Sequence, residues 1–230
     1  MTGFGIGSIL TPVFNTHVDM RLAVGAVSIP HLVATALRFW RMRHDTDWRV
    51  LRTFGLMSAA GGLTGALLQR SATSPVLTIV FAGVLIFVGI AGLTGLSERM
   101  RFAGVVGWFA GAASGLLGGL VGNQGGIRSA ALLGYDLSPG AFVATATAVG
   151  LIVDASRMPI YAVSDGARIL GLAPTIAVAT AACVAGTIAG ERIPGPDPAA
   201  PVPAVRRAAG ARARRLHAVA RHCERALTER

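Results

Sequence analysis

The stretch 118–128 combines residue types that could bind a small anion. It contains five glycines, two amide side chains and one guanidinium group. Glycines leave backbone N–H groups accessible, amides supply neutral donors, and a guanidinium adds a permanent charge with a planar donor set suited to an oxoanion. The residues of this stretch that we predict to bind substrate are Asn123, Gln124, Gly125, Gly126 and Arg128.

A packing role is the alternative interpretation of the same stretch. Glycines let neighbouring helices approach closely, and a long arginine side chain can extend to the lipid headgroups. We favour the anion site, because Asn123, Gln124 and Arg128 place three polar side chains within six residues, which is more than helix packing requires.

Asp154 and Arg157 form a second candidate, inside an apolar segment. Their i, i+3 spacing places both on one helix face, where they can form an ion pair. The pair either neutralises two charges in lipid or lets Asp154 carry a coupling proton. We expect Arg38, near a helix end, to be an interface anchor and His31 to be a hydrogen-bonded core histidine rather than a proton relay.

The sequence lacks the residue patterns typical of an enzyme or a metalloprotein. Its five histidines show no metal-ligand or catalytic-triad spacing with cysteines or carboxylates, and Cys183 and Cys223 lie in very different settings. We therefore predict no catalytic residue, no metal and no cofactor. An integral-membrane enzyme is the alternative hypothesis, with Asp154 as its one candidate residue.

The composition indicates a protein embedded in a membrane. Of the 230 residues, 53% are hydrophobic and only 14% are charged, which is too apolar for an ordinary soluble domain. The first residues lack the basic region and cleavage site of a signal peptide. We predict a multi-pass protein of the inner (cytoplasmic) membrane, with the lipid bilayer as one partner.

Six apolar segments are expected to be helices, and a polar loop is expected at 41–52. Residues 2–14 are too short and too rich in glycine to span a bilayer, so we predict a broken or re-entrant piece there. Small residues in the second segment should let it pack closely against another helix. The six segments are 22–40, 53–69, 75–96, 102–121, 139–163 and 169–190.

Aligning the sequence with itself at an offset of 119 residues indicates an internal repeat. The offset pairs Gly7 with Gly126 and Arg38 with Arg157. We therefore predict an all-α bundle of transmembrane helices made of two inverted repeats, 1–101 and 102–190, each with a glycine-rich broken or re-entrant helix. In the first repeat, the glycines expected to contribute to substrate binding are Gly3, Gly5 and Gly7.

The distribution of arginines favours the inverted orientation. Basic residues cluster around 41–52, whereas its repeat partner 164–168 has one arginine offset by one aspartate. By the positive-inside rule, the first of these loops is cytoplasmic. Residues 102–135 must then enter and leave on the cytoplasmic side, as a V-shaped hairpin with the glycine-rich break at its tip.

The two ends of the sequence depart from the repeat. The counterpart of 102–121 would precede Met1, so the first repeat is expected to lack its leading arm. Residues 191–230 hold nine arginines against four acidic residues, where an apolar helix is expected. We interpret this tail as disordered or non-native, the product of a shifted reading frame; the alternative is a native basic tail that contacts anionic lipid.

Two glycine-rich stretches carry a family resemblance. Residues 3–12 (GFGIGSILTP) and 122–128 (GNQGGIR) resemble the duplicated signatures of the TauE/SafE family, over roughly 1–190. The resemblance implies a secondary transporter that moves sulfite, a sulfonate or a related sulfur oxoanion by alternating access. No ATP-binding motif is present, so a proton or ion gradient is the expected driving force. In another alternative the basic tail binds lipid or nucleic acid, although we do not expect a nucleic-acid partner.

Overall fold

Among residues 5–96, 102 and 104–192, which the computed structural model describes, every regular element is a helix. Five of the described helices are long and apolar enough to cross a membrane, which confirms the predicted all-α membrane protein. Gly3 and the tail from residue 193 onward lie outside the described residues. The five helices are α2 (Met20–Met42), α5 (Ser74–Thr94), α7 (Gly104–Val121), α9 (Pro139–Leu170) and α10 (Ala173–Arg192).

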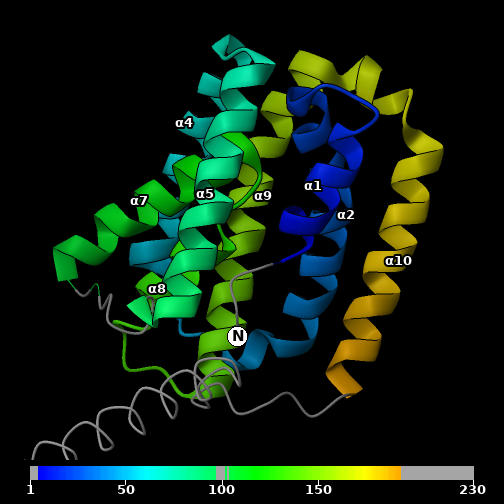
Figure 1. Cartoon of the computed structure of the whole chain (residues 1–230). Helices are drawn as coiled ribbons and strands as arrows, with labels where there is room; N and C mark the ends of the chain where they lie inside the picture. Colours follow the sequence, from blue (N-terminus) through cyan, green and yellow to red (C-terminus); the bar gives the residue numbers. More distant parts are fainter. Residues whose placement is uncertain (1–4, 97–101, 103, 193–230) are drawn as a thin grey trace, which may run out of the picture.

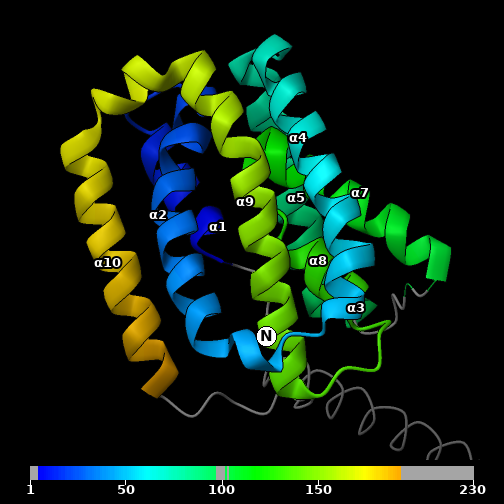
Figure 2. The ribbon, with the colours of Figure 1, turned by 180° about the vertical axis from the view of Figure 1, so that it is seen from behind.

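Helices α2 and α9 lie between the other elements of the bundle. Both views place α10 at one edge and α7 at the opposite edge (Figures 1 and 2). Helix α2 packs on α9 and α10, and α4 (Leu56–Ser71) packs on α7 and α9. Elements from the two halves of the sequence are therefore interleaved, and the division into 1–101 and 102–190 stays a prediction.

The polar loop predicted at 41–52 is shorter than expected. A 3₁₀ turn, η1 (Arg43–Asp45), follows α2, and α3 (Trp48–Val50) already begins the next helix. The Asp47 carboxylate accepts hydrogen bonds from the backbone N–H groups of Arg49 (2.9 Å) and Val50 (3.0 Å). Because this cap satisfies the first turn, the helix starts there and continues through the π turn η2 (Leu51–Gly55) into α4.

The prediction of a loop at 164–168 is wrong, because α9 continues through these residues to Leu170. Asp165 has non-helical dihedral angles (φ −135°, ψ 16°), so the helix kinks there rather than ending. The charges that suggested a loop are instead paired with the start of α2. Arg21 Nε lies 2.9 Å from Asp165 Oδ2, and Arg168 forms an ion pair with Asp19.

Close packing between α4 and α7 depends on glycine at several positions. A side chain at Gly61 would strike the carbonyl of Ala112, and one at Gly115 would strike the carbonyl of Ser58. Backbones that approach this closely leave no room for a Cβ atom. The small residues of the second predicted segment therefore have the predicted role, and the contact holds α7 in place up to its C-terminal end.

Element boundaries follow the 119-residue offset. Helix α1 (Ile6–Asn15) begins 119 residues before α8 (Gly125–Leu132), and the N-cap of α2, Asp19, lies 119 residues before the N-cap of α9, Ser138. Helix α1 runs from the middle of the bundle toward one end and α8 toward the other (Figures 1 and 2). The inverted symmetry axis itself stays a prediction.

Candidate functional site

The break between α7 and α8 is shaped by Gly122 and Ser114. Gly122 has φ 74°, a left-handed conformation that favours glycine, and its N–H donates to the carbonyl of Gly118 at 3.0 Å. The buried hydroxyl of Ser114 donates to the carbonyl of Gln124 at 3.3 Å. Helix α7 therefore ends with a sharp turn at Gly122. The Ser114 side chain of α7 fixes the backbone of the break through its hydrogen bond to Gln124.

Residues on either side of the break return to one end of the bundle. A Cβ atom at Gly134 would clash with the backbone of Phe102. A Cβ atom at Gly107 would clash with the hydroxyl of Tyr135. The start of α7 and the end of α8 therefore lie together, with 122–124 at the tip. That these residues form the re-entrant hairpin stays a prediction.

The two glycine-rich breaks meet each other. A Cβ atom at Gly7, in the first turn of α1, would lie 2.5 Å from the carbonyl oxygen of Gly122. No side chain caps α1 at its N-cap Gly5 or α8 at its N-cap Gln124, as far as the described residues go. Helix N-termini carry free N–H groups and the positive end of the helix dipole, so their convergence favours an anion.

Polar atoms at the tip are buried without partners. Asn123 and Gln124 are only 4% and 5% exposed, and neither polar atom of the Gln124 amide has a hydrogen-bond partner in the described part of the chain. The same is true of the Nε and Nη1 atoms of Arg128. Unpaired buried polar atoms are costly, so both side chains are candidates for contact with a ligand.

The guanidinium of Arg128 lies in a region of excess positive charge. Its Nη1 would be 2.7 Å from a Cβ atom at Gly150, so that glycine makes room for it. The charged groups that act on it are Asp154, Arg38 and Arg157. Arg38 Nε is also buried without a described partner, so part of this expected interface anchor faces the interior.

Asp154 and Arg157 form the ion pair that their spacing predicts. Arg157 Nη2 lies 2.7 Å and Nε 3.1 Å from Asp154 Oδ1. The other carboxylate oxygen, Oδ2, lies 2.5 Å from Nδ1 of His31 on α2, so His31 is hydrogen-bonded as expected. Asp154 is fully buried, and it joins α2 to α9.

Arg157 and its neighbour Tyr161 also hold the end of α7. Arg157 Nη1 donates to the carbonyl of Gly118, and the Tyr161 hydroxyl donates to the carbonyl of Gly119. The Gly118 carbonyl also accepts from the Gly122 N–H, and a cation near the last carbonyls of a helix is favourable. The ion pair is thereby connected to the chain just before the break.

The glycines predicted to bind substrate have different surroundings. Gly7 contacts Gly122, and a Cβ atom at Gly126 would lie 2.5 Å from a methyl group of Val88 on α5, so close packing accounts for both. Gly5 is exposed, and a Cβ atom there would have no neighbouring atom within 4 Å among the described residues. A substrate contact at these glycines stays a prediction.

Sequence reasoning missed several residues around the site. Ser114 and Tyr161 act on backbone carbonyls, which no motif indicates. The 119-residue offset could have identified Gly150, because it pairs this glycine with His31. The structure places both of these paired positions beside the polar cluster of Arg128 and Asp154.

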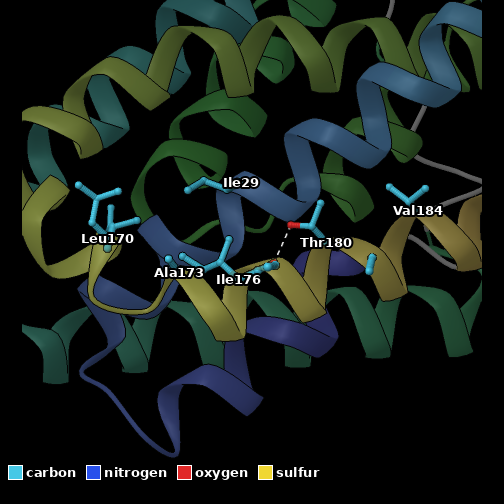
Figure 3. Close-up of a pocket in the computed structure, with 9 residues that line it drawn as sticks. Ile29, Leu170, Ala173, Ile176, Thr180 and Val184 are labelled. Atoms are coloured by element: carbon cyan, nitrogen blue, oxygen red, sulfur yellow. Dashed lines mark hydrogen bonds between the residues drawn. The ribbon is translucent and has the colours of Figure 1, made fainter.

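An apolar pocket elsewhere does not suit an anion. It has a volume of about 550 Å³ and lies between α2, α9 and α10, lined by residues such as Ile29, Ile176 and Val184 (Figure 3). Its one polar lining side chain is Thr180, whose hydroxyl donates to the carbonyl of Ile176 at 2.7 Å. Such a lining offers a charged ligand no compensation for lost water.

Comparison with known proteins adds one finding. A family model described as sulfite exporter TauE/SafE matches residues 1–200. The match includes both glycine-rich breaks and extends about ten residues past the resemblance that we expected. No curated protein and no solved structure matches the chain.

Proposed function

The chain belongs to the TauE/SafE sulfite exporter family, a family of membrane transporters, and from this we propose that it moves a small sulfur oxoanion across the cytoplasmic membrane. Sulfite, a sulfonate or a related anion is the proposed substrate, and alternating access is the proposed mechanism. Transport, rather than catalysis, is the function that we assign.

The observation that carries this proposal is that buried, unpaired polar side-chain atoms lie at or near the start of a helix that no side chain caps. Helix α1 begins just before Gly7, which contacts Gly122; α8 begins three residues after Gly122, with Gln124 at its N-cap and Arg128 in its first turn. An oxoanion there would accept hydrogen bonds from backbone N–H groups and from both side chains. Its charge would also offset the surplus of guanidinium groups around Arg128.

Alternating access agrees with how the site is built. The two breaks come from elements of different halves of the chain, and α1 and α8 lead from the breaks to opposite ends of the bundle (Figures 1 and 2). Movement of one half against the other would open the meeting point to one side at a time.

Counterflow in proteoliposomes tests the proposal. The purified full chain is reconstituted and exchange of labelled sulfite, sulfate, thiosulfate and sulfoacetate is measured. We expect flux for at least one anion, and Arg128→Gln should lower its apparent affinity about tenfold or more, because a charge-assisted hydrogen bond is lost.

Two further variants sharpen the result. Gly150→Ala keeps the charge of Arg128 but places a methyl group against its Nη1. This variant should therefore also lower the affinity for the anion. Arg52→Gln removes an exposed arginine on another helix and should leave flux unchanged. Absence of flux for every anion would contradict the transport assignment, and normal affinity in Arg128→Gln would contradict the site.

A further inference from the structure

We propose that His31, hydrogen-bonded to Asp154, binds the proton that couples anion movement to a proton gradient. This proposal rests on the transport function proposed above and names its coupling site. The sequence favours a core histidine over a proton relay here; the structure places a histidine and a carboxylate from two different helices beside the cluster of guanidinium groups.

Hydrogen bonding fixes the protonation of the pair. Arg157 donates two hydrogen bonds to Oδ1 of Asp154, as it would to an ionised carboxylate. The 2.5 Å contact between Asp154 Oδ2 and His31 Nδ1 then requires that Nδ1 carry the hydrogen. A proton taken from water must bind the other ring nitrogen, Nε2, which turns the neutral imidazole into an imidazolium ion.

Burial makes the histidine the entry point for that proton. Asp154 has none of its side chain exposed, whereas 17% of the His31 side chain is exposed. No described residue forms a hydrogen bond with His31 Nε2. Protons can therefore reach the pair through the imidazole without breaking the bonds between Asp154 and Arg157.

The surrounding charges link this proton to the anion. Helix α2 contributes His31 and Arg38, α9 contributes Asp154, Arg157 and the Tyr161 hydroxyl, and α8 contributes Arg128. Helices α1 and α7 contain no titratable side chain. A proton on His31 would add positive charge to this cluster of guanidinium groups and one carboxylate, so it would attract an anion bound there.

Linkage makes the effect reciprocal. If an anion raises the proton affinity of His31, then a proton on His31 raises the affinity for the anion by the same factor. Anion affinity should therefore increase as pH falls through the range in which histidine titrates, and anion and proton should move in the same direction. The Asp154 contact with Arg157, and through it with the Gly118 carbonyl, connects the proton site to the hairpin.

Proton-driven uptake in proteoliposomes tests the coupling. Labelled sulfate and thiosulfate are suitable probes, because their charge is constant between about pH 5 and 8, where histidine changes its own. In the unmodified chain an inward proton gradient should stimulate uptake about fivefold or more, and a protonophore should abolish the stimulation. His31→Gln should lose the stimulation while counterflow without a gradient persists.

Controls separate coupling from folding. His44→Gln alters an exposed histidine in η1 and should keep both counterflow and the response to the gradient. Each variant is checked for a monodisperse elution profile before reconstitution. If sulfite is the one anion carried, variants are compared at matched pH, so that protonation of sulfite itself is the same in each comparison.

Each remaining outcome has a definite meaning. A normal response to the gradient in His31→Gln, or no response in the unmodified chain, would overturn the coupling site and leave the transport function standing. Loss of counterflow in a monodisperse His31→Gln would also overturn it, because His31 would then hold the anion rather than the proton. Absence of any flux in the unmodified chain would overturn both proposals.

Discussion

Two buried side chains, Arg157 and Tyr161, bind the C-terminal end of α7. Both donate to backbone carbonyls of the last turn, at Gly118 and Gly119, immediately before the break that holds the proposed anion site. The spacing of Asp154 and Arg157 predicts their ion pair. The carbonyl partners follow only from how α9 is placed against α7, so the same arginine has a local partner and a distant one.

Removing the Tyr161 hydroxyl should destabilise the hairpin. In Tyr161→Phe the buried carbonyl of Gly119 loses its donor, at a cost of about 1–3 kcal/mol. The midpoint of thermal unfolding in detergent should fall, and counterflow should weaken because α7 ends less rigidly.

The chain supplies a matched control for this substitution. The hydroxyl of Tyr135, its only other tyrosine, is buried without a partner in the described residues, so Tyr135→Phe removes no hydrogen bond. Its unfolding midpoint should be unchanged or higher. Equal destabilisation in the two variants would show that the Tyr161 hydrogen bond has no special weight.

At the scale of elements, the contact between α4 and α7 is the closest in the bundle. Glycines of each helix face carbonyls of the other, including Gly61 against Ala112 and Gly115 against Ser58. Without a strong hydrophobic effect between helices in lipid, such close backbone packing is a main source of association. The position of the hairpin therefore depends on residues that carry no functional group.

A methyl group in this contact should separate the two helices. Gly115→Ala places a Cβ atom against the Ser58 carbonyl, and overpacking of this kind costs about 1–3 kcal/mol. Gly83→Ala, on an exposed and open part of α5, should be neutral or stabilising, because alanine favours helix. Thermal unfolding of both variants measures the difference, and similar midpoints would argue against close packing as the reason for the glycine.

The junction between α2 and α9 should respond to acid through Asp19. Partial burial alone would raise the pKa of the Asp19 carboxyl, but hydrogen bonds from Arg168 and the Leu22 N–H outweigh it and lower that pKa. A carboxyl with a lowered folded-state pKa stabilises the protein above its unfolded value, near pH 4, and loses that effect as pH falls through the folded value.

Unfolding measured as a function of pH checks this effect. The midpoint of the unmodified chain should decline as pH drops below about 4, and the decline should be smaller in Asp19→Asn. Asp136→Asn, which changes an exposed aspartate outside the helices, should retain the full decline. The same pH profile in Asp19→Asn as in the unmodified chain would exclude this contribution.

For the whole molecule, the arginines around the turn after α2 predict an orientation in the membrane. The positive-inside rule places η1 on the cytoplasmic side, so the connection between α4 and α5 should face the opposite side. In a background with Cys183 and Cys223 replaced by serine, Thr73→Cys should react with an impermeant maleimide in intact cells. His44→Cys should react only after permeabilisation, and the reverse pattern would invert the topology.

Much of this architecture was predictable from the order of residues, because hydrophobic length and glycine content are local properties. Apolar runs of spanning length predicted the long helices, and the run 118–128 predicted a break. The two errors, at 41–52 and 164–168, arose because we interpreted charged residues as evidence of a loop. Asp47 caps a helix start instead, and Asp165 pairs across the bundle with Arg21.

Which distant groups meet depends on the packing of the helices. No spacing in the chain indicates that His31 bonds to Asp154, that Gly7 touches Gly122, or that Gly150 makes room for Arg128. These contacts join residues more than twenty and up to 123 positions apart, and they depend on the packing of α1, α2 and α9 around the hairpin. The order of residues limits which side chains are of a type that suits an anion; packing decides which of them find a partner, because most of these pairings need a group from another helix.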